Sequence, residues 1–210
     1  MRGRDIKRYH YEFADLYLIT TFPSRNYNID DYPAIKQHLL NIGFERLEQS
    51  GKTYIVNGET IKARKKTSNK WFETQDSISY WDDFSKQKIV YREISEVMDA
   101  CLVEPDIYLN NKCYFLTGEH LEYLLCIFNS KLFNKMILSN ANLTGGKGCG
   151  FLGNVKIPYP NSEVSKRLKT LYYQMQEASD EDKELFEDEI ENCVFDLYNI
   201  TTEERAAINQ

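Results

Sequence analysis

The spacing of the apolar residues changes near residue 164, and this change constrains the fold more than any other feature of the sequence. Before it, apolar residues gather in short β-branched and aromatic segments that favour half-buried strands: 16–20, 88–94 and 112–116. After it, they recur at helical spacing in two stripes: Val164, Leu168, Leu171, Tyr172 and Met175, then Phe186, Ile190, Val194 and Leu197. A polar stretch, SDEDKE, separates the stripes. We therefore expect an antiparallel helical hairpin at the C-terminal end.

One dipeptide predicts a β-hairpin in the first third of the chain. Asn57-Gly58 lies between two short segments, 53–56 and 60–62. Both residues adopt positive φ at low cost, which a two-residue type I′ turn requires at its two central positions. This is the clearest local signal in the sequence.

Capping signals and apolar periodicity predict three further helices. The first is expected to be capped by Asp30 or Asp31, to have Pro33 near its first position and to end near Gly43. The second is expected to open at Thr117, to pack its apolar face in the core and to run toward Leu138. A capping box over residues 201–204 predicts a short last helix.

Together these elements predict an α+β fold. We expect an irregular, mostly antiparallel β core with two packed helices, followed by the helical hairpin and the last short helix. The dense acidic residues of the hairpin are expected to form a solvated helix face, and the hairpin to pack back on the domain or on another part of a larger protein.

Composition excludes several classes of protein. With 42% hydrophobic and 13% aromatic residues, the chain has too much apolar area to remain disordered. No apolar run is long enough to span a membrane, and the first residues contain no apolar signal core. The five Cys are an odd number without a Cys-x-x-Cys pair, which favours buried free thiols in a reduced compartment. The sequence therefore predicts a cytoplasmic protein without a membrane partner.

Charge is unevenly distributed along the chain. The net charge of −6 consists of +5 over residues 1–70, −3 over 71–160 and −8 over 161–210. A basic first third is typical of a protein with an anionic partner, although solvated charge asymmetry is also common. A nucleic acid therefore remains a candidate partner despite the acidic average.

No catalytic constellation is evident. Residues 148–153 have the spacing of a dinucleotide fingerprint, but Pro158 and Pro160 forbid the helix that must follow it. A Cys113–His120 pair would meet only by accident of folding, and no serine nucleophile motif or methyl-donor motif is present. Pro105-Asp106 and the acidic turn at 181–183 do not make a credible nuclease metal site. We expect no active site, resident cofactor or metal in this chain.

Several basic and amide side chains are candidates for binding DNA. The segment 62–71 clusters them without apolar periodicity, so it is either a DNA-facing loop or a solvated basic loop. Trp71 is expected to anchor this loop in the core. Lys147, in a glycine-rich segment, can approach a phosphate or belong to a merely flexible loop. Arg2 and Arg4 can touch phosphate or line an inter-domain junction. The candidates are Arg64, Lys65, Lys66, Asn69, Lys70, Arg25, Asn26, Lys147, Arg2 and Arg4.

Six segments in a fixed order resemble one family. They are RGRDIKRY (2–9), LYLITTFPSRNYNIDDYPAIKQHL (16–39), NKWFETQDSISYWDDFSKQKIVYREI (69–94), CIFNSKL (126–132), IPYP (157–160) and LYNITTEE (197–204). The order is similar to that of the TaqI-like C-terminal specificity domain. This domain is the target-recognition part of adenine-N6 DNA methyltransferases and of type IIG restriction-modification enzymes.

The resemblance implies a function and a division of the chain. Residues 1–15 would connect from an absent methyltransferase domain, 16–160 would form a β-rich target-recognition domain, and 161–210 the helical hairpin and last helix. The partners would be double-stranded DNA and the methyltransferase domain of the same parent protein. The parent would use S-adenosylmethionine, and Mg²⁺ if it cleaves DNA. The alternatives are a non-catalytic protein-interaction or structural module, and a free-standing enzyme.

Overall fold

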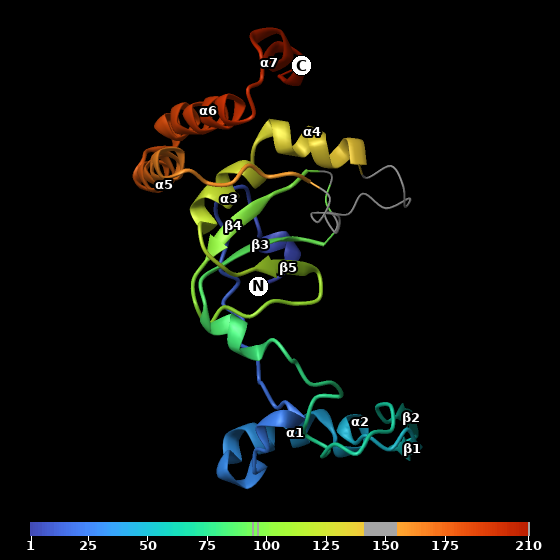
Figure 1. Ribbon diagram of the computed structural model, residues 1–210. Helices are drawn as coiled ribbons and strands as arrows, with labels where there is room; N and C mark the ends of the chain where they lie inside the picture. Colours follow the sequence, from blue (N-terminus) through green and yellow to red (C-terminus); the bar gives the residue numbers. More distant parts are fainter. Residues whose placement is uncertain (94, 96, 141–154, 210) are drawn as a thin grey trace. The chain divides into compact units, whose positions relative to one another are not determined.

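The computed structural model describes residues 1–93, 95, 97–140 and 155–209. The chain forms two compact units, and each is described by itself. Unit 1 consists of Met1–Leu16 and Asp82–Gln210, and unit 2 of Tyr17–Trp81. The fold is α+β, as predicted, with C-terminal helices (Figure 1). No helix within the described ranges is both long and apolar enough to span a membrane.

A three-stranded antiparallel sheet forms the centre of unit 1. Its order is β4 (Ala100–Val103), β3 (Lys88–Arg92) and β5 (Cys113–Leu116) (Figure 1). The two faces of β3 contact different groups: Ile89 belongs to the main core under the helices, whereas Val90 packs with Ile6 of the N-terminal segment. A strand buried on both faces reads as a continuous apolar run, which explains the KIVY segment.

Five helices follow the sheet in the described part of unit 1. They are α3 (Leu121–Phe128), α4 (Lys131–Asn140), α5 (Ser162–Glu177), α6 (Asp180–Leu197) and α7 (Thr202–Ile208). Helices α5 and α6 form the predicted hairpin, and their stripes meet α3 and the sheet through Leu168, Met175, Ile190 and Val194. The acidic hairpin therefore packs back on the domain. The capping box at the start of α7 is confirmed: Thr201 Oγ1 accepts from Glu204 N, and the Glu204 carboxylate from Thr201 N.

Unit 2 is small and built around few apolar residues. It contains α1 (Pro33–Ile42), α2 (Phe44–Leu47), β1 (Thr53–Val56) and β2 (Glu59–Lys62). Ile29, Leu39 and Phe72 are its core cluster, with Trp71 packed against them as predicted. Helix α1 ends at Ile42, and the C-cap residue Gly43 has a φ of 112°, which suits a residue without a side chain.

Three sequence-based predictions of local structure were wrong. Residues 16–20 belong to no strand; Leu16 and Leu18 expose 61% and 59% of their area, because β propensity without a neighbouring strand makes no ladder. Asp30 and Asp31 do not cap α1 but lie in a 3₁₀ turn before it, and the N-cap position is Tyr32. The helix expected from Thr117 toward Leu138 is two helices, α3 and α4.

Tertiary hydrogen bonds explain the break between α3 and α4. Asn129 leaves the helix to pair with Ala100 of β4, donating Nδ2 to its carbonyl and accepting from its amide, both at 2.9 Å. Ser130 Oγ then accepts from Phe133 N, and the Glu191 carboxylate of α6 accepts from Lys131 N at 3.0 Å. Ser130 is thus the local N-cap of α4, and Glu191 of α6 adds a tertiary acceptor for the amides at the start of this helix.

The described cysteines are free thiols. Cys101, Cys126 and Cys193 are buried and Cys113 is half-buried, as expected. Burial raises the pKa of the Cys101 thiol to about 12 and of Cys113 to about 11, so both are protonated at neutral pH. They act as small apolar side chains in the core.

Candidate nucleic-acid interface

The β1–β2 hairpin carries the candidate interface of unit 2. Its register pairs Thr53 with Lys62 and Val56 with Glu59. Asn57 and Gly58 have φ values of 51° and 84°, which confirms the predicted type I′ turn. Beyond the strands the pairing continues, because Ala63 N donates to Lys52 O and Gly51 N to Arg64 O, both at 2.9 Å.

Arg64 fixes the base of this hairpin. Its guanidinium donates from Nε to the carbonyl of Leu47 and from Nη2 to the carbonyl of Trp71, both at 2.6 Å. Burial lowers the pKa of Arg64, but a guanidinium remains charged at neutral pH. The side chain therefore joins α2, the hairpin and the following loop.

Two amide side chains organise that following loop. Gln49 is buried and donates Nε2 to the carbonyls of Lys70 and Glu73, while its Oε1 accepts from Thr67 Oγ1 at 2.6 Å. Asn69 donates Nδ2 to the carbonyls of Thr74 and Gln75 at 3.0 Å. The sequence analysis missed Gln49, because nothing in a polar segment marks one amide as buried.

Lys70 joins the same loop to an earlier part of unit 2. Its Nζ donates to the carbonyl of Tyr27 at 3.0 Å and lies 3.9 Å from the Glu73 carboxylate. Next to Tyr27, the exposed Arg25 stacks over Trp81 at 5.5 Å from the ring centroid, and Asn26 has a φ of 51°. The structure thus connects the 25–27 and 62–71 segments, which are far apart in sequence.

Four lysines at the base of the hairpin differ from these internal donors. Lys52, Lys62, Lys65 and Lys66, here called the foot lysines, are all exposed. Within the part of the chain that the structure describes, their amines make no hydrogen bond or ion pair. The backbone pairing brings their segments together, and the Lys66 amide lies close to Gly51. Exposed ammonium groups at such density suit phosphate oxygens.

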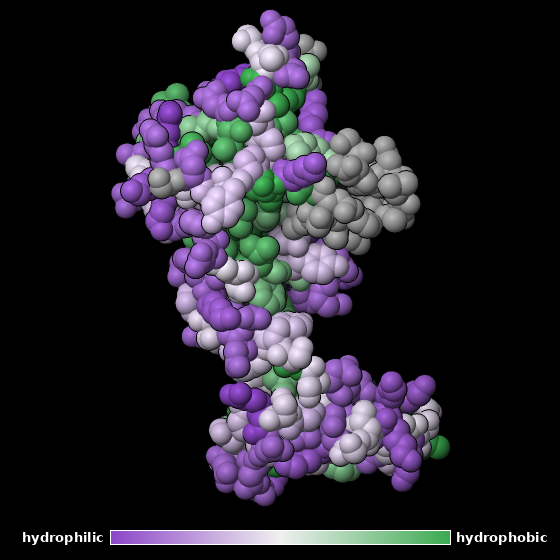
Figure 2. All heavy atoms as spheres, in the orientation of Figure 1, coloured by the Kyte–Doolittle hydropathy of each residue, from purple (hydrophilic) through white to green (hydrophobic). Residues whose placement is uncertain are grey.

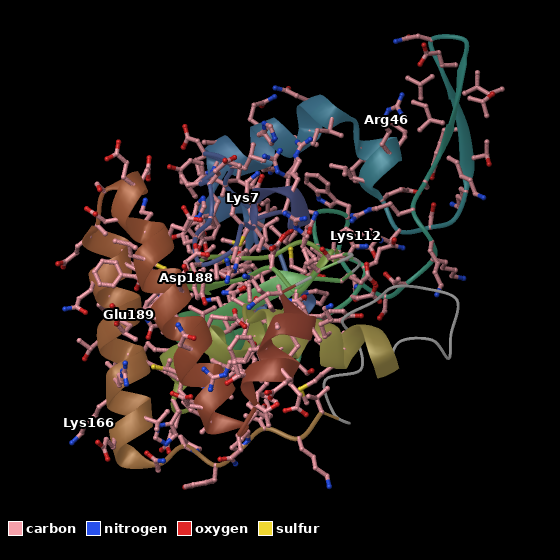
Figure 3. All side chains as sticks on the ribbon, turned by 90° about the horizontal axis from the view of Figure 1, so that it is seen from above. Lys7, Arg46, Lys112, Lys166, Asp188 and Glu189 are labelled. Atoms are coloured by element: carbon pink, nitrogen blue, oxygen red, sulfur yellow. The ribbon has the colours of Figure 1, made fainter. Side chains whose placement is uncertain are left out.

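The acidic residues near the hairpin are few and mostly paired. Between Gly51 and Lys66 there are five Lys and Arg and one acid, Glu59. Glu59 lies 3.8 Å from Arg46, which extends from α2 beside the hairpin (Figure 3). Unit 2 has nine Lys and Arg against seven Asp and Glu, a net charge of +2, whereas unit 1 carries −8. The net positive charge therefore belongs to unit 2.

The remaining candidates lie elsewhere. Arg2 makes a forked ion pair with the buried Asp5, with Nη2 at 2.8 Å from Oδ1, and this hydrogen bond lowers the pKa of the Asp5 carboxyl. Arg4 is exposed in unit 1. Lys147 lies outside the described residues. Arg2 and Arg4 thus belong to unit 1, whereas the foot lysines belong to unit 2.

The acidic helix α6 has the opposite character. Its Glu187 pairs with Arg8, while Asp188 and Glu189 are exposed (Figure 3). Such a surface repels phosphate. The carboxylates of α6 thus either contact other parts of unit 1 or face solvent.

Comparison with known proteins identifies the family. Among curated proteins, none matches the chain. A family model, that of the TaqI-like C-terminal specificity domain, matches residues 1–147. The match includes all of unit 2 and the sheet of unit 1, and it ends before α5. The chain therefore belongs to the TaqI-like C-terminal specificity domains, the DNA sequence-specificity domains of restriction-modification enzymes.

Proposed function

We propose that this chain recognises double-stranded DNA for an adenine-N6 methyltransferase of a restriction-modification system, and that unit 2 makes the contacts. The observation that carries the proposal is the group of four exposed foot lysines on a hairpin whose base is held by Arg64. A supported base keeps charged groups in place, so less entropy is lost when DNA binds. Family membership indicates that the ligand is DNA, and the foot lysines form the surface that contacts it.

The side chains divide into positioning groups and DNA-facing groups. Arg64, Asn69 and Lys70 donate to backbone carbonyls, so their part is to shape the loop. Lys65 and Lys66 extend into solvent from that shaped loop and meet phosphates. Arg25 and Asn26, tied to the loop through Tyr27, add a second contact region. Phosphate contacts fix the register of the protein on the duplex but carry no sequence information.

The parent enzyme supplies the chemistry. Methylation of adenine requires that the base be flipped out of the duplex into a catalytic pocket, while a second surface holds the flanking DNA. The methyltransferase domain of the same parent protein provides that pocket and binds S-adenosylmethionine. If the parent also cleaves DNA, its nuclease centre uses Mg²⁺. Arg4 and the rest of the N-terminal segment connect the two domains.

Selection from a randomised duplex library tests the proposal. The purified full chain is incubated with the library at low salt, which strengthens phosphate contacts, and bound DNA is sequenced against input. We expect a short motif to be enriched. A chain that enriches nothing, both alone and together with the proposed methyltransferase domain, does not recognise DNA sequence and is instead an interaction module.

A matched pair of variants locates the surface. Lys65→Ala with Lys66→Ala should weaken binding of every duplex similarly, because both lysines contact phosphate. Lys166→Ala, which removes an exposed lysine of α5 in unit 1 (Figure 3), is the control and should bind as the wild type does. Equal affinities of all three proteins would place the DNA elsewhere.

A further inference from the structure

The two faces of the β1–β2 hairpin are unequal. On one face Tyr54, Val56 and Ile61 are half-buried, and the Tyr54 hydroxyl donates to Glu48 next to α2. The register places Thr53, Ile55, Thr60 and Lys62 on the opposite face, and all four are exposed. The hairpin thus has a packed face and a free face.

The free face is uncharged except at its base. Ile55 exposes 81% of its area and lies opposite Thr60. Asn57 continues the face at the turn, while Lys62 lies at the opposite end beside the other foot lysines. Over β1 and β2 the surface is mostly hydrophilic or neutral, with a small apolar spot (Figure 2). Ile55 is thus an apolar side chain at a highly exposed position of a two-stranded ribbon.

The dimensions of the hairpin suit the major groove of DNA. A strand of four residues is about 13 Å long. The major groove is about 12 Å wide and 8.5 Å deep, and it admits a two-stranded β-ribbon. With the foot lysines at the groove edges, where phosphates lie, the free face and the turn meet the edges of the bases.

We infer that the β1–β2 hairpin enters the major groove and that Ile55, Asn57 and Thr60 determine which bases this protein recognises. The inference deepens the proposed function and rests on it. The Asn57 amide has the donor and acceptor that match the N7 and N6 atoms of adenine. The Ile55 side chain packs against a thymine methyl group, and the Thr60 hydroxyl contacts either type of base edge. The foot lysines hold phosphate and leave sequence choice to the free face.

The variants Ile55→Ser and Asn57→Gly test this inference. Both keep the hairpin, because Ile55 is exposed and glycine suits the positive φ of residue 57. Each variant is carried through the library selection beside the wild type. We expect each to bind non-specific duplex as the wild type does and to lose at least about fivefold discrimination at one or two adjacent positions of the motif.

Matched controls come from unit 1. Leu185→Ser removes an aliphatic side chain that is 63% exposed, and Asn199→Gly replaces another asparagine with positive φ. Both should keep the wild-type motif at every position. Thermal unfolding and circular dichroism of all four proteins verify that the fold is retained.

The outcomes separate this inference from the proposed function. If Ile55→Ser and Asn57→Gly both retain the complete wild-type motif, the domain still recognises DNA but the hairpin does not choose bases, and the inference is wrong. If no protein enriches any motif, the proposed function fails and the inference fails with it. A loss at all positions together, with weaker non-specific binding, assigns the hairpin to phosphate contact and also overturns base recognition.

Discussion

One group of basic side chains in each unit is used in the opposite way from the other. In unit 1, Lys88 is fully buried and donates to three backbone carbonyls, and Arg92 donates to the carbonyls of Gly3 and Ile6. In unit 2, the foot lysines extend into solvent from a hairpin that other side chains hold. The difference teaches that a chain of net charge −6 presents a basic surface when four neighbouring lysines of one small unit make no ion pair within the described part of the chain.

The units also differ in how they are stabilised. The core of unit 1 joins a sheet and several helices around residues such as Leu168 and Val194. The core cluster of unit 2 holds Ile29, Leu39 and Phe72, and polar contacts of Arg64 and Gln49 complete it. The apolar core of unit 1 is therefore much larger, and unit 2 relies on hydrogen bonds to backbone carbonyls to complete its small core.

The largest expected effect concerns DNA affinity. Replacing all four foot lysines by alanine should lower affinity at low salt about a thousandfold and reduce the slope of log K against log salt by about 3 to 4, because each lost phosphate contact removes about 0.9. Filter binding or fluorescence anisotropy across a salt series measures both quantities. If the slope is unchanged, DNA does not bind on unit 2, and the difference in charge between the two units has no role in DNA binding.

Next in size is the loss of a core side chain from unit 1. Leu168→Ala should lower the free energy of unfolding of unit 1 by about 3 kcal/mol, since Leu168 is fully buried. Both tryptophans, Trp71 and Trp81, lie in unit 2, so their fluorescence reports that unit while far-UV circular dichroism follows mainly the helices of unit 1. The circular dichroism transition should shift in urea more than the fluorescence transition. Equal shifts would mean that the two units unfold together.

A smaller effect should follow from loss of the Arg64 contacts in unit 2. Arg64→Met leaves the carbonyls of Leu47 and Trp71 without their donor and should cost about 2 kcal/mol. In urea, the fluorescence transition of Arg64→Met should shift more than its circular dichroism transition. Lys65→Met is the matched control and should leave stability within about 0.5 kcal/mol of the wild type. If Arg64→Met is as stable as the wild type and shows relaxed base preference, Arg64 contacts bases and does not hold the loop.

The smallest effect concerns pH and the joint between α3 and α5. Burial opposes ionisation of Glu122, but hydrogen bonds from Lys169 at 2.7 Å and Tyr173 at 3.0 Å outweigh it and lower the pKa of the carboxyl. A lowered pKa in the folded state stabilises the protein above the ordinary pKa of glutamate, and this contribution is lost as pH falls through the lowered value. Glu122→Gln should therefore cost about 1 kcal/mol at pH 7.

The difference in the free energy of unfolding between the wild type and Glu122→Gln should become smaller as the pH falls. Urea unfolding at pH 7 and at pH 3, followed by circular dichroism, provides the comparison. A gap between wild type and variant that stays constant with pH would show that Glu122 acts by packing and not by charge. The fluorescence transition of unit 2 should be the same in both proteins.

Much of the fold was predictable because it depends on neighbouring residues. The Asn57-Gly58 turn, the stripes of α5 and α6 and the capping box of α7 each express preferences of a few adjacent residues. Strand β4 and helix α2 escaped prediction because each is only four residues long and lacks periodicity. The division of the chain at 15/16 and 160/161 remains a functional prediction, and the compact units follow other boundaries.

The candidate site was only partly predictable, for a related reason. The sequence by itself determined where basic side chains concentrate, where the hairpin turns and where the helical pair lies, because these follow from local composition and backbone preference. Only the tertiary structure decided that Arg64 and Asn69 bind carbonyls while Lys65 and Lys66 remain free, and that a helix breaks at Asn129. These contacts depend on groups that are distant in sequence, such as the Leu47 carbonyl and strand β4. A local sequence pattern carries no information about where such groups lie.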